Sequence, residues 1–124
     1  MFRRININPH SNRVDDCVVR AIALAANMDW EEVYDGLYLF GRDLKAMPNT
    51  NFVWDAYLRH IGFKRYVIPN TCPDCYTVRM FCEDNPHSTV ILCTGTHAVC
   101  AIEGDYFDTW DSGNEVPLYF YERT

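Results

Sequence analysis

Three residue types that can together perform nucleophilic catalysis occur in the order cysteine, histidine, aspartate. Cys17 opens an apolar segment, and His97 follows 80 residues later at the start of a β-type segment. The acidic residues Asp108 and Asp111 come after a short turn. In such a set the thiolate attacks, the imidazole moves the proton, and the carboxylate holds the imidazole in the required tautomer. The order therefore predicts a thiol nucleophile with a histidine base.

The position of Cys17 at the start of a helix has a physical use. Unpaired backbone N–H groups and the helix dipole favour a negative charge there, and this lowers the pKa of a thiol. Asp15 and Asp16 oppose the effect by like charge, unless one of them is held as the helix cap. Each residue also has a simpler interpretation, because Cys17 could fill a buried helix face and His97 could be a hydrogen-bonded core histidine.

Two carboxylates compete for the place beside the imidazole. A turn at Gly104-Asp105 would bring the strands on either side of it together. A symmetric turn centred on Gly104 places Asp111 opposite His97, whereas a small change of register favours Asp108. The residues alone leave both candidates open.

The same positions carry a resemblance to a known superfamily. Asp16-Cys17 at a helix start, His97-Ala98-Val99 opening a strand and Asp108-Thr109-Trp110 after a hairpin resemble the papain-like cysteine peptidases. Small phage-type or bacterial members are the nearer likeness, together with bacteriocin-processing peptidase domains, which also place Asp before Cys. The resemblance implies that Asp108 orients His97 and that Trp110 shields the pair from water.

The chain also departs from that superfamily. The papain signature Cys-Gly-Ser/Ala-Cys-Trp/Tyr is absent around Cys17, and the spacing to His97 is shorter than the ~130–150 residues of papain. The family usually places a Gln about six residues before the cysteine as the oxyanion donor, whereas position 11 here is Ser11. Asn12 and the backbone N–H of Cys17 are the candidate donors.

The pattern of apolar residues predicts helices before strands. Helices are expected over residues 17–27, 30–45, 51–61 and 76–84. Asp29 and Glu32 are expected to form a capping box at the start of the second helix. Strands are expected over 63–68, 89–94, 97–103, 106–110 and 116–121, and residues 1–14 as an extended arm and loop. We therefore expect one α+β domain over residues 1–124. By the resemblance it is papain-like, with N-terminal helices and a central nucleophile helix packed on a C-terminal antiparallel sheet.

The composition and net charge of the chain indicate which partners and which cellular location to expect. The net charge of −6 argues against nucleic acid or an anionic membrane surface as a partner. The sequence shows neither a secretory signal nor ~20 consecutive apolar residues, so a cytoplasmic protein with reduced cysteines is expected. Cys72 and Cys75 form a CxxC pattern, which could be a packed loop, a redox pair, or zinc ligands together with Cys82 and His87.

These observations favour a thiol hydrolase, most simply a cysteine peptidase or isopeptidase that acts on a protein or peptide and needs no cofactor or metal. Cys17 is the expected nucleophile, His97 the base and Asp108 the orienting carboxylate. Two alternatives stay open. The domain could be a non-catalytic interaction protein on the same fold, or the acyl-enzyme could pass to an amine or release ammonia, as in transglutaminases and glutamine deamidases.

Overall fold

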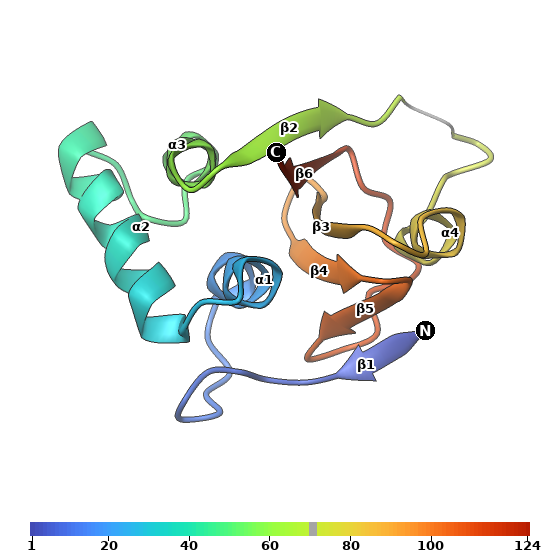
Figure 1. Cartoon of the computed structure of the whole chain (residues 1–124), viewed down its shortest axis with the longest axis horizontal. Coiled ribbons are helices and arrows are strands. Elements are labelled where there is room, and N and C mark those ends of the chain that lie inside the picture. The colour runs from blue at the N-terminus through green and yellow to red at the C-terminus, as the bar shows by residue number, and fades with distance from the viewer. Residues whose placement is uncertain (70–71) are drawn as a thin grey trace.

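The computed structural model describes residues 1–69 and 72–124, and its centre is one mixed β-sheet (Figure 1). The described chain forms six strands in the spatial order β1-β5-β4-β3-β6-β2. Strand β1 is parallel to β5, and every other pair is antiparallel. The strands are β1 (Phe2–Arg4), β2 (Phe63–Val67), β3 (Thr89–Cys93), β4 (Ala98–Ile102), β5 (Asp105–Asp108) and β6 (Tyr119–Arg123).

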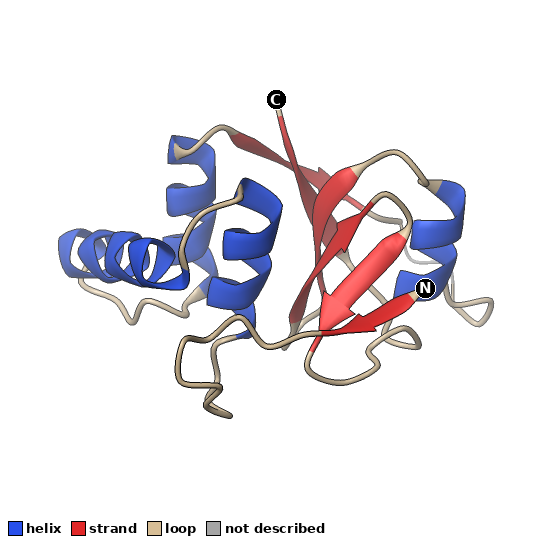
Figure 2. Cartoon of the chain, turned by 60° about the horizontal axis from the view of Figure 1, so that its bottom comes forward, coloured by secondary structure: helices blue, strands red, loops and turns tan. Residues whose placement is uncertain are grey.

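Helices cover both faces of this sheet. The described helices are α1 (Cys17–Ala26), α2 (Trp30–Leu44), α3 (Asn51–His60) and α4 (Val78–Asp84). Figure 2 shows the sheet standing between α1, α2 and α3 on one side and α4 on the other. Helix α1 packs directly on β4, so the first residue of the helix lies near one end of the central strands.

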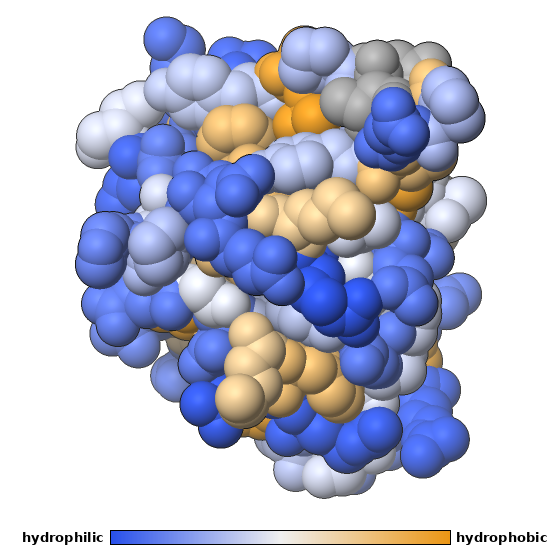
Figure 3. All heavy atoms as spheres, turned by 90° about the vertical axis from the view of Figure 1, so that its right-hand side faces the viewer, coloured by the Kyte–Doolittle hydropathy of each residue, from blue (hydrophilic) through white to orange (hydrophobic). Residues whose placement is uncertain are grey.

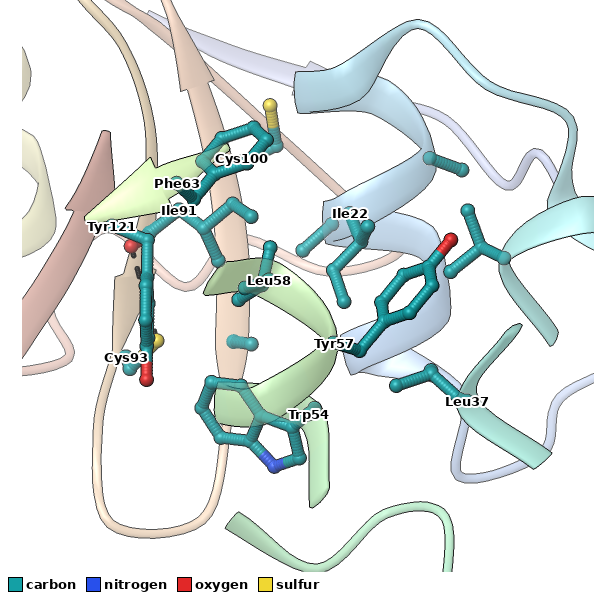
Figure 4. Close-up of a cluster of buried hydrophobic side chains, with 14 of the residues drawn as sticks. Ile22, Leu37, Trp54, Tyr57, Leu58, Phe63, Ile91, Cys93, Cys100 and Tyr121 are labelled. Atoms are coloured by element: carbon teal, nitrogen blue, oxygen red, sulfur yellow. Dashed lines mark hydrogen bonds between the residues drawn. The ribbon is translucent and has the colours of Figure 1, made fainter. Parts of the chain in front are cut away.

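Alternating side chains of the central strands divide the core in two. Ile91 and Cys93 of β3, with Cys100 of β4, pack against the face formed by α1 and α3. Val90 and Leu92 of β3 pack on the opposite face against α4. This alternation is the two-residue period of a strand that is buried on both faces. Figure 4 shows the larger core, where side chains of α1 and α3 meet those of the sheet.

The α+β class is confirmed, but the expected sheet differs in two respects. The segment Phe2–Arg4, expected as an arm, is a strand beside β5. Strand β6 lies between β3 and β2 rather than at the end of a meander, and the parallel strand β1 makes the sheet mixed. Both differences come from pairings between distant segments, which local residue patterns do not encode.

The helix ends combine expected and unexpected features. Asn27 stops α1 in the left-handed conformation with φ 55°, as its position near the end of the apolar segment predicted. Helix α2 ends at Leu44, and Lys45 also adopts a left-handed conformation. The capping box expected from Asp29 is wrong, because the Asp29 side chain makes no cap hydrogen bond.

None of the helices in the described part of the chain combines the length and apolar character that crossing a bilayer requires. The face around α4 and the N-terminus is mainly hydrophilic, with apolar side chains in separate patches (Figure 3). Small separate patches are ordinary on protein surfaces.

Candidate active site

The first turn of α1 and the start of β4 bring Cys17 and His97 together. Cys17 is the first residue of α1, and His97 immediately precedes β4. The Cys17 sulfur is hydrogen-bonded to the His97 side chain and to the backbone of Ala98. The His97 backbone N–H donates to Thr94 Oγ1 at 2.9 Å, which holds the loop before β4. The predicted nucleophile and base are therefore in direct contact.

Asp108 binds the other side of the imidazole. His97 Nε2 lies 2.6 Å from Asp108 Oδ2, and because an ionised carboxylate can only accept, Nε2–H is the donor. Nδ1 is then the ring nitrogen left to face Cys17. The indole of Trp110 lies against the imidazole, with ring centroids 4.9 Å apart. The structure thus places Cys17, His97 and Asp108 in one continuous line of contacts.

Asp108 is itself held by several donors although it is almost fully buried. Ser112 Oγ donates to Oδ2 at 2.7 Å, and the backbone N–H of Thr109 donates to Oδ1 at 2.8 Å. The Arg20 guanidinium reaches Oδ1 at 3.4 Å. Burial by itself would raise the pKa of Asp108, but the bonds from His97 and Ser112 and the charge of His97 lower it below its usual range. Asp108 is therefore held as a carboxylate.

Asp111, the other candidate, points to different partners. Its Oδ1 accepts from the Tyr106 hydroxyl at 2.5 Å and from the Gly113 N–H at 3.0 Å. The expected symmetric turn centred on Gly104 is wrong. The turn has two residues, Glu103 and Gly104, both with positive φ as in a type I′ turn.

The register of this hairpin accounts for the choice of carboxylate. Cys100 lies opposite Phe107, and continuing that register puts Trp110 opposite His97. Asp111 falls beyond this pair and turns away, whereas Asp108 at the end of β5 reaches the imidazole. A shift of one residue in the turn is enough to exchange candidates of this kind.

The electrostatics favour an ion pair between Cys17 and His97. Burial opposes a thiolate, but the hydrogen bonds from His97 and Ala98 and the charges of His97 and Arg20 together lower the pKa of Cys17 below its ordinary value. Burial likewise opposes the imidazolium, yet the bonds to Asp108 and Cys17 raise the pKa of His97 to about 9. Both shifts stabilise the thiolate beside the imidazolium.

A buried network connects α1 to this site. Asp16 is the N-cap residue of α1, but its side chain makes no cap hydrogen bond and instead forms an ion pair with Arg20 one turn later. Asp16 Oδ2 also accepts from Trp30 Nε1 at 3.0 Å and from Asn8 Nδ2 at 3.3 Å. Because Arg20 neutralises Asp16, this carboxylate does not act as an uncompensated negative charge beside the thiolate.

Both Cys17 and His97 line each of two cavities. The first, of about 480 Å³, includes Asn12, and the second, of about 360 Å³, includes Trp54. Asn12 thus lines the same space as the nucleophile, as a candidate oxyanion donor should. Trp54 Nε1 is the one buried side-chain nitrogen or oxygen without a hydrogen-bond partner in residues 1–69 and 72–124. Figure 4 shows Trp54 on α3 beside the core.

The other cysteines lie apart from this site. Cys72 and Cys75 form a disulfide, which corrects the expectation that all six thiols are free and removes both from a zinc set in this structure. No cluster of three or more potential metal ligands occurs among the described residues, Cys82 and His87 included. Burial raises the pKa of Cys82 to about 11 and also raises the pKa values of Cys93 and Cys100. Cys17 is the free cysteine with a lowered pKa among the described residues.

Comparison with known proteins adds no assignment, since no family model, curated protein or solved structure matches this chain. The interpretation of the site therefore depends on its geometry. Sequence reasoning missed the contacts of Ser112 and Arg20 with Asp108. The place of Arg20 inside the otherwise apolar segment 17–26 indicates a need for a carboxylate or for backbone carbonyls as partners, but nothing local pointed to Ser112.

Proposed function

We propose that this protein is a papain-like thiol hydrolase that acts on protein or peptide carbonyl groups, most simply as a cysteine peptidase or isopeptidase. The observation that carries the proposal is the unbroken line of contacts from the Cys17 sulfur through the His97 ring to the Asp108 carboxylate. The line begins at the first residue of α1, beside open cavities. A helix packed on a sheet that presents His and Asp also agrees with the papain-like arrangement.

The residues suggest a two-stage reaction. The Cys17 thiolate attacks the carbonyl carbon, and the resulting oxyanion accepts hydrogen bonds from the Cys17 backbone N–H and the Asn12 side chain. The His97 imidazolium gives its proton to the leaving amine as the C–N bond breaks, which leaves a thioester on Cys17. Neutral His97 then takes a proton from water, and the hydroxide so formed releases the acid and restores the thiolate. Asp108 keeps the ring oriented through both stages.

The first test is the pH dependence of alkylation by iodoacetamide, mapped to each cysteine by mass spectrometry. Cys17 should react at a lower pH than a free thiol, whose pKa is about 8.5. His97→Ala should move the Cys17 profile upwards by removing the main partner of the thiolate. A Cys17 profile like that of a free thiol in the unmodified protein would contradict the proposal.

A second measurement addresses catalysis and its acceptor. A peptide-based acyl-site probe should label the native protein covalently and should not label Cys17→Ala, with circular dichroism showing that the variant keeps its fold. The mass of products from a peptide library, incubated with and without an added amine, separates hydrolysis from acyl transfer and deamidation. Equal probe labelling in Cys17→Ala would remove Cys17 as the nucleophile.

A further inference from the structure

Two arginines that line the first cavity form no ion pair within the described part of the chain. Arg4 and Arg13 line the same 480 Å³ cavity as Cys17 and His97. The Arg4 guanidinium donates to the backbone oxygen of Thr109 at 2.7 Å, which is an uncharged acceptor. Neither arginine forms a salt bridge within residues 1–69 and 72–124. The charge of Arg4 does help to lower the pKa of Asp111, but neither guanidinium lies within ion-pair distance of a carboxylate in the described residues.

The rest of the cavity strengthens this contrast. Arg20 also lines it, but that arginine is already paired with Asp16 and Asp108. Asp15 is the one carboxylate among the lining residues. The chain as a whole has a net charge of −6, so the charge at this point is opposite in sign to that of the molecule.

The second cavity that Cys17 lines has a different charge. Besides Cys17 and His97 it is lined by amide, hydroxyl and apolar side chains, Asp15 being its charged residue, and it contains no arginine or lysine. The two cavities therefore offer different environments to a substrate, and the unpaired arginines line only the first of them.

We propose that Arg4 and Arg13 bind a carboxylate of the substrate next to the scissile bond, so that the enzyme prefers acidic substrates. This inference rests on the proposed thiol hydrolase function and specifies its substrate class. A guanidinium suits the task because its fork of N–H donors matches the two oxygens of a carboxylate. The carboxylate has two possible sources, an acidic side chain or the free C-terminus of a peptide, and both carry the same chemistry.

A pair of small alkylating agents tests the charge at Cys17 before any substrate is known. Iodoacetate carries a carboxylate on the reacting carbon, whereas iodoacetamide has nearly the same shape without charge. The quantity measured is the rate with iodoacetate divided by the rate with iodoacetamide at Cys17. This ratio should fall about two-fold in Arg4→Gln and about two-fold in Arg13→Gln. In the double variant it should fall by about the product of the two single effects. Arg4→Lys keeps the charge and should keep most of the ratio.

Arg42→Gln provides the matched control, because it removes the same charge from the last turn of α2, away from this cavity. Its ratio should equal that of the native protein. The difference between native protein and double variant should shrink as salt is raised, since exposed charges are screened. Ratios that are unchanged in both cavity variants, or lowered equally by Arg42→Gln, would overturn the inference.

Peptide substrates then identify the source of the carboxylate. Matched peptides carry Glu or Gln beside the cleaved bond, each with either an amidated or a free C-terminus. Preference for Glu in amidated peptides assigns the site to an acidic side chain, and preference for the free C-terminus assigns it to the chain end. Cleavage without either preference overturns the inference but leaves the hydrolase proposal intact. An unreactive Cys17 instead removes the hydrolase proposal itself.

Discussion

At the scale of single residues, the site distinguishes between two aspartates that are three positions apart. Asp108 is almost fully buried and contacts His97 Nε2 at 2.6 Å. Asp111 is exposed and binds the Tyr106 hydroxyl and the Gly113 N–H. The two residues are chemically identical, so a comparison of their amide variants isolates the effect of position.

Asp108→Asn should lower kcat/KM about 10-fold or more, because an amide carbonyl can still accept from Nε2–H but does not stabilise the imidazolium as a carboxylate does. The pKa of His97, raised to about 9 in the native protein, should fall in the same variant, as followed by NMR of the ring carbons. Asp111→Asn should leave both the rate and the His97 titration close to native. Equal effects of the two substitutions would show that Asp108 has no special role.

At the scale of the element, α1 carries both the proposed nucleophile and the cation that pairs with two buried carboxylates. Cys17 begins the helix and Arg20 follows within one turn, where it pairs with Asp16 on the same helix and with Asp108 at the end of β5. Arg20 is 8% exposed and both carboxylates are more deeply buried. Removing the cation would leave two buried negative charges, which is far more costly than losing an exposed pair.

Arg20→Met should therefore lower the free energy of unfolding by about 3–5 kcal/mol, measured by urea denaturation. The chain offers a matched control, because Arg59 pairs with Asp55 at the same four-residue spacing on α3 but at the surface. Arg59→Met should cost much less. Comparable losses in the two variants would mean that burial does not determine the strength of the Arg20 network.

At the scale of the whole molecule, the free energy of unfolding should depend on pH, because the pKa values of His97 and Cys17 are shifted by folding. A histidine whose pKa is raised on folding stabilises the native state below its unfolded pKa, and this contribution is lost as the pH rises through the folded value. For His97 the loss extends from about 6.5 to about 9. A cysteine with a lowered pKa has the opposite effect, because it adds stability as the pH rises towards its unfolded value.

The two contributions should offset one another in the native protein, so its free energy of unfolding should vary little where both groups titrate. In Cys17→Ala only the His97 contribution remains, with Asp108 still raising its pKa. Stability should then fall above pH ~6.5 with a slope of at most about 1.4 kcal/mol per pH unit. Urea denaturation between pH 6 and 9 measures this, and adding His97→Gln to Cys17→Ala should flatten the curve. A flat curve in Cys17→Ala alone would refute the proposed coupling.

Much of the element order could be predicted from the sequence, because it depends on neighbouring residues. The apolar segment from Cys17 to Asn27, and the Gly and Pro residues that end other segments, predicted helices and strands close to those observed. The order of Cys17, His97 and an aspartate also indicated the chemistry. Resemblance to a family, rather than spacing, favoured Asp108 over Asp111.

Contacts between distant segments could not be predicted in this way. The parallel pairing of β1 with β5 joins residues about 100 positions apart, and the bond from Arg20 to Asp108 spans 88. The hairpin register depended on Glu103 adopting a positive φ, which is uncommon for a residue other than glycine.

The sequence by itself determined the α+β class, the position of Cys17 at a helix start and the set of residues able to form a triad. Only the tertiary structure decided that Asp108 rather than Asp111 faces His97, that Arg20 joins two buried carboxylates, and that Arg4 and Arg13 share a cavity with the nucleophile. The reason is physical. Helix and strand formation follow from local backbone preferences and from the periodic burial of side chains. Side chains from distant segments meet only when packing sets the register of the sheet and the position of the helix on it.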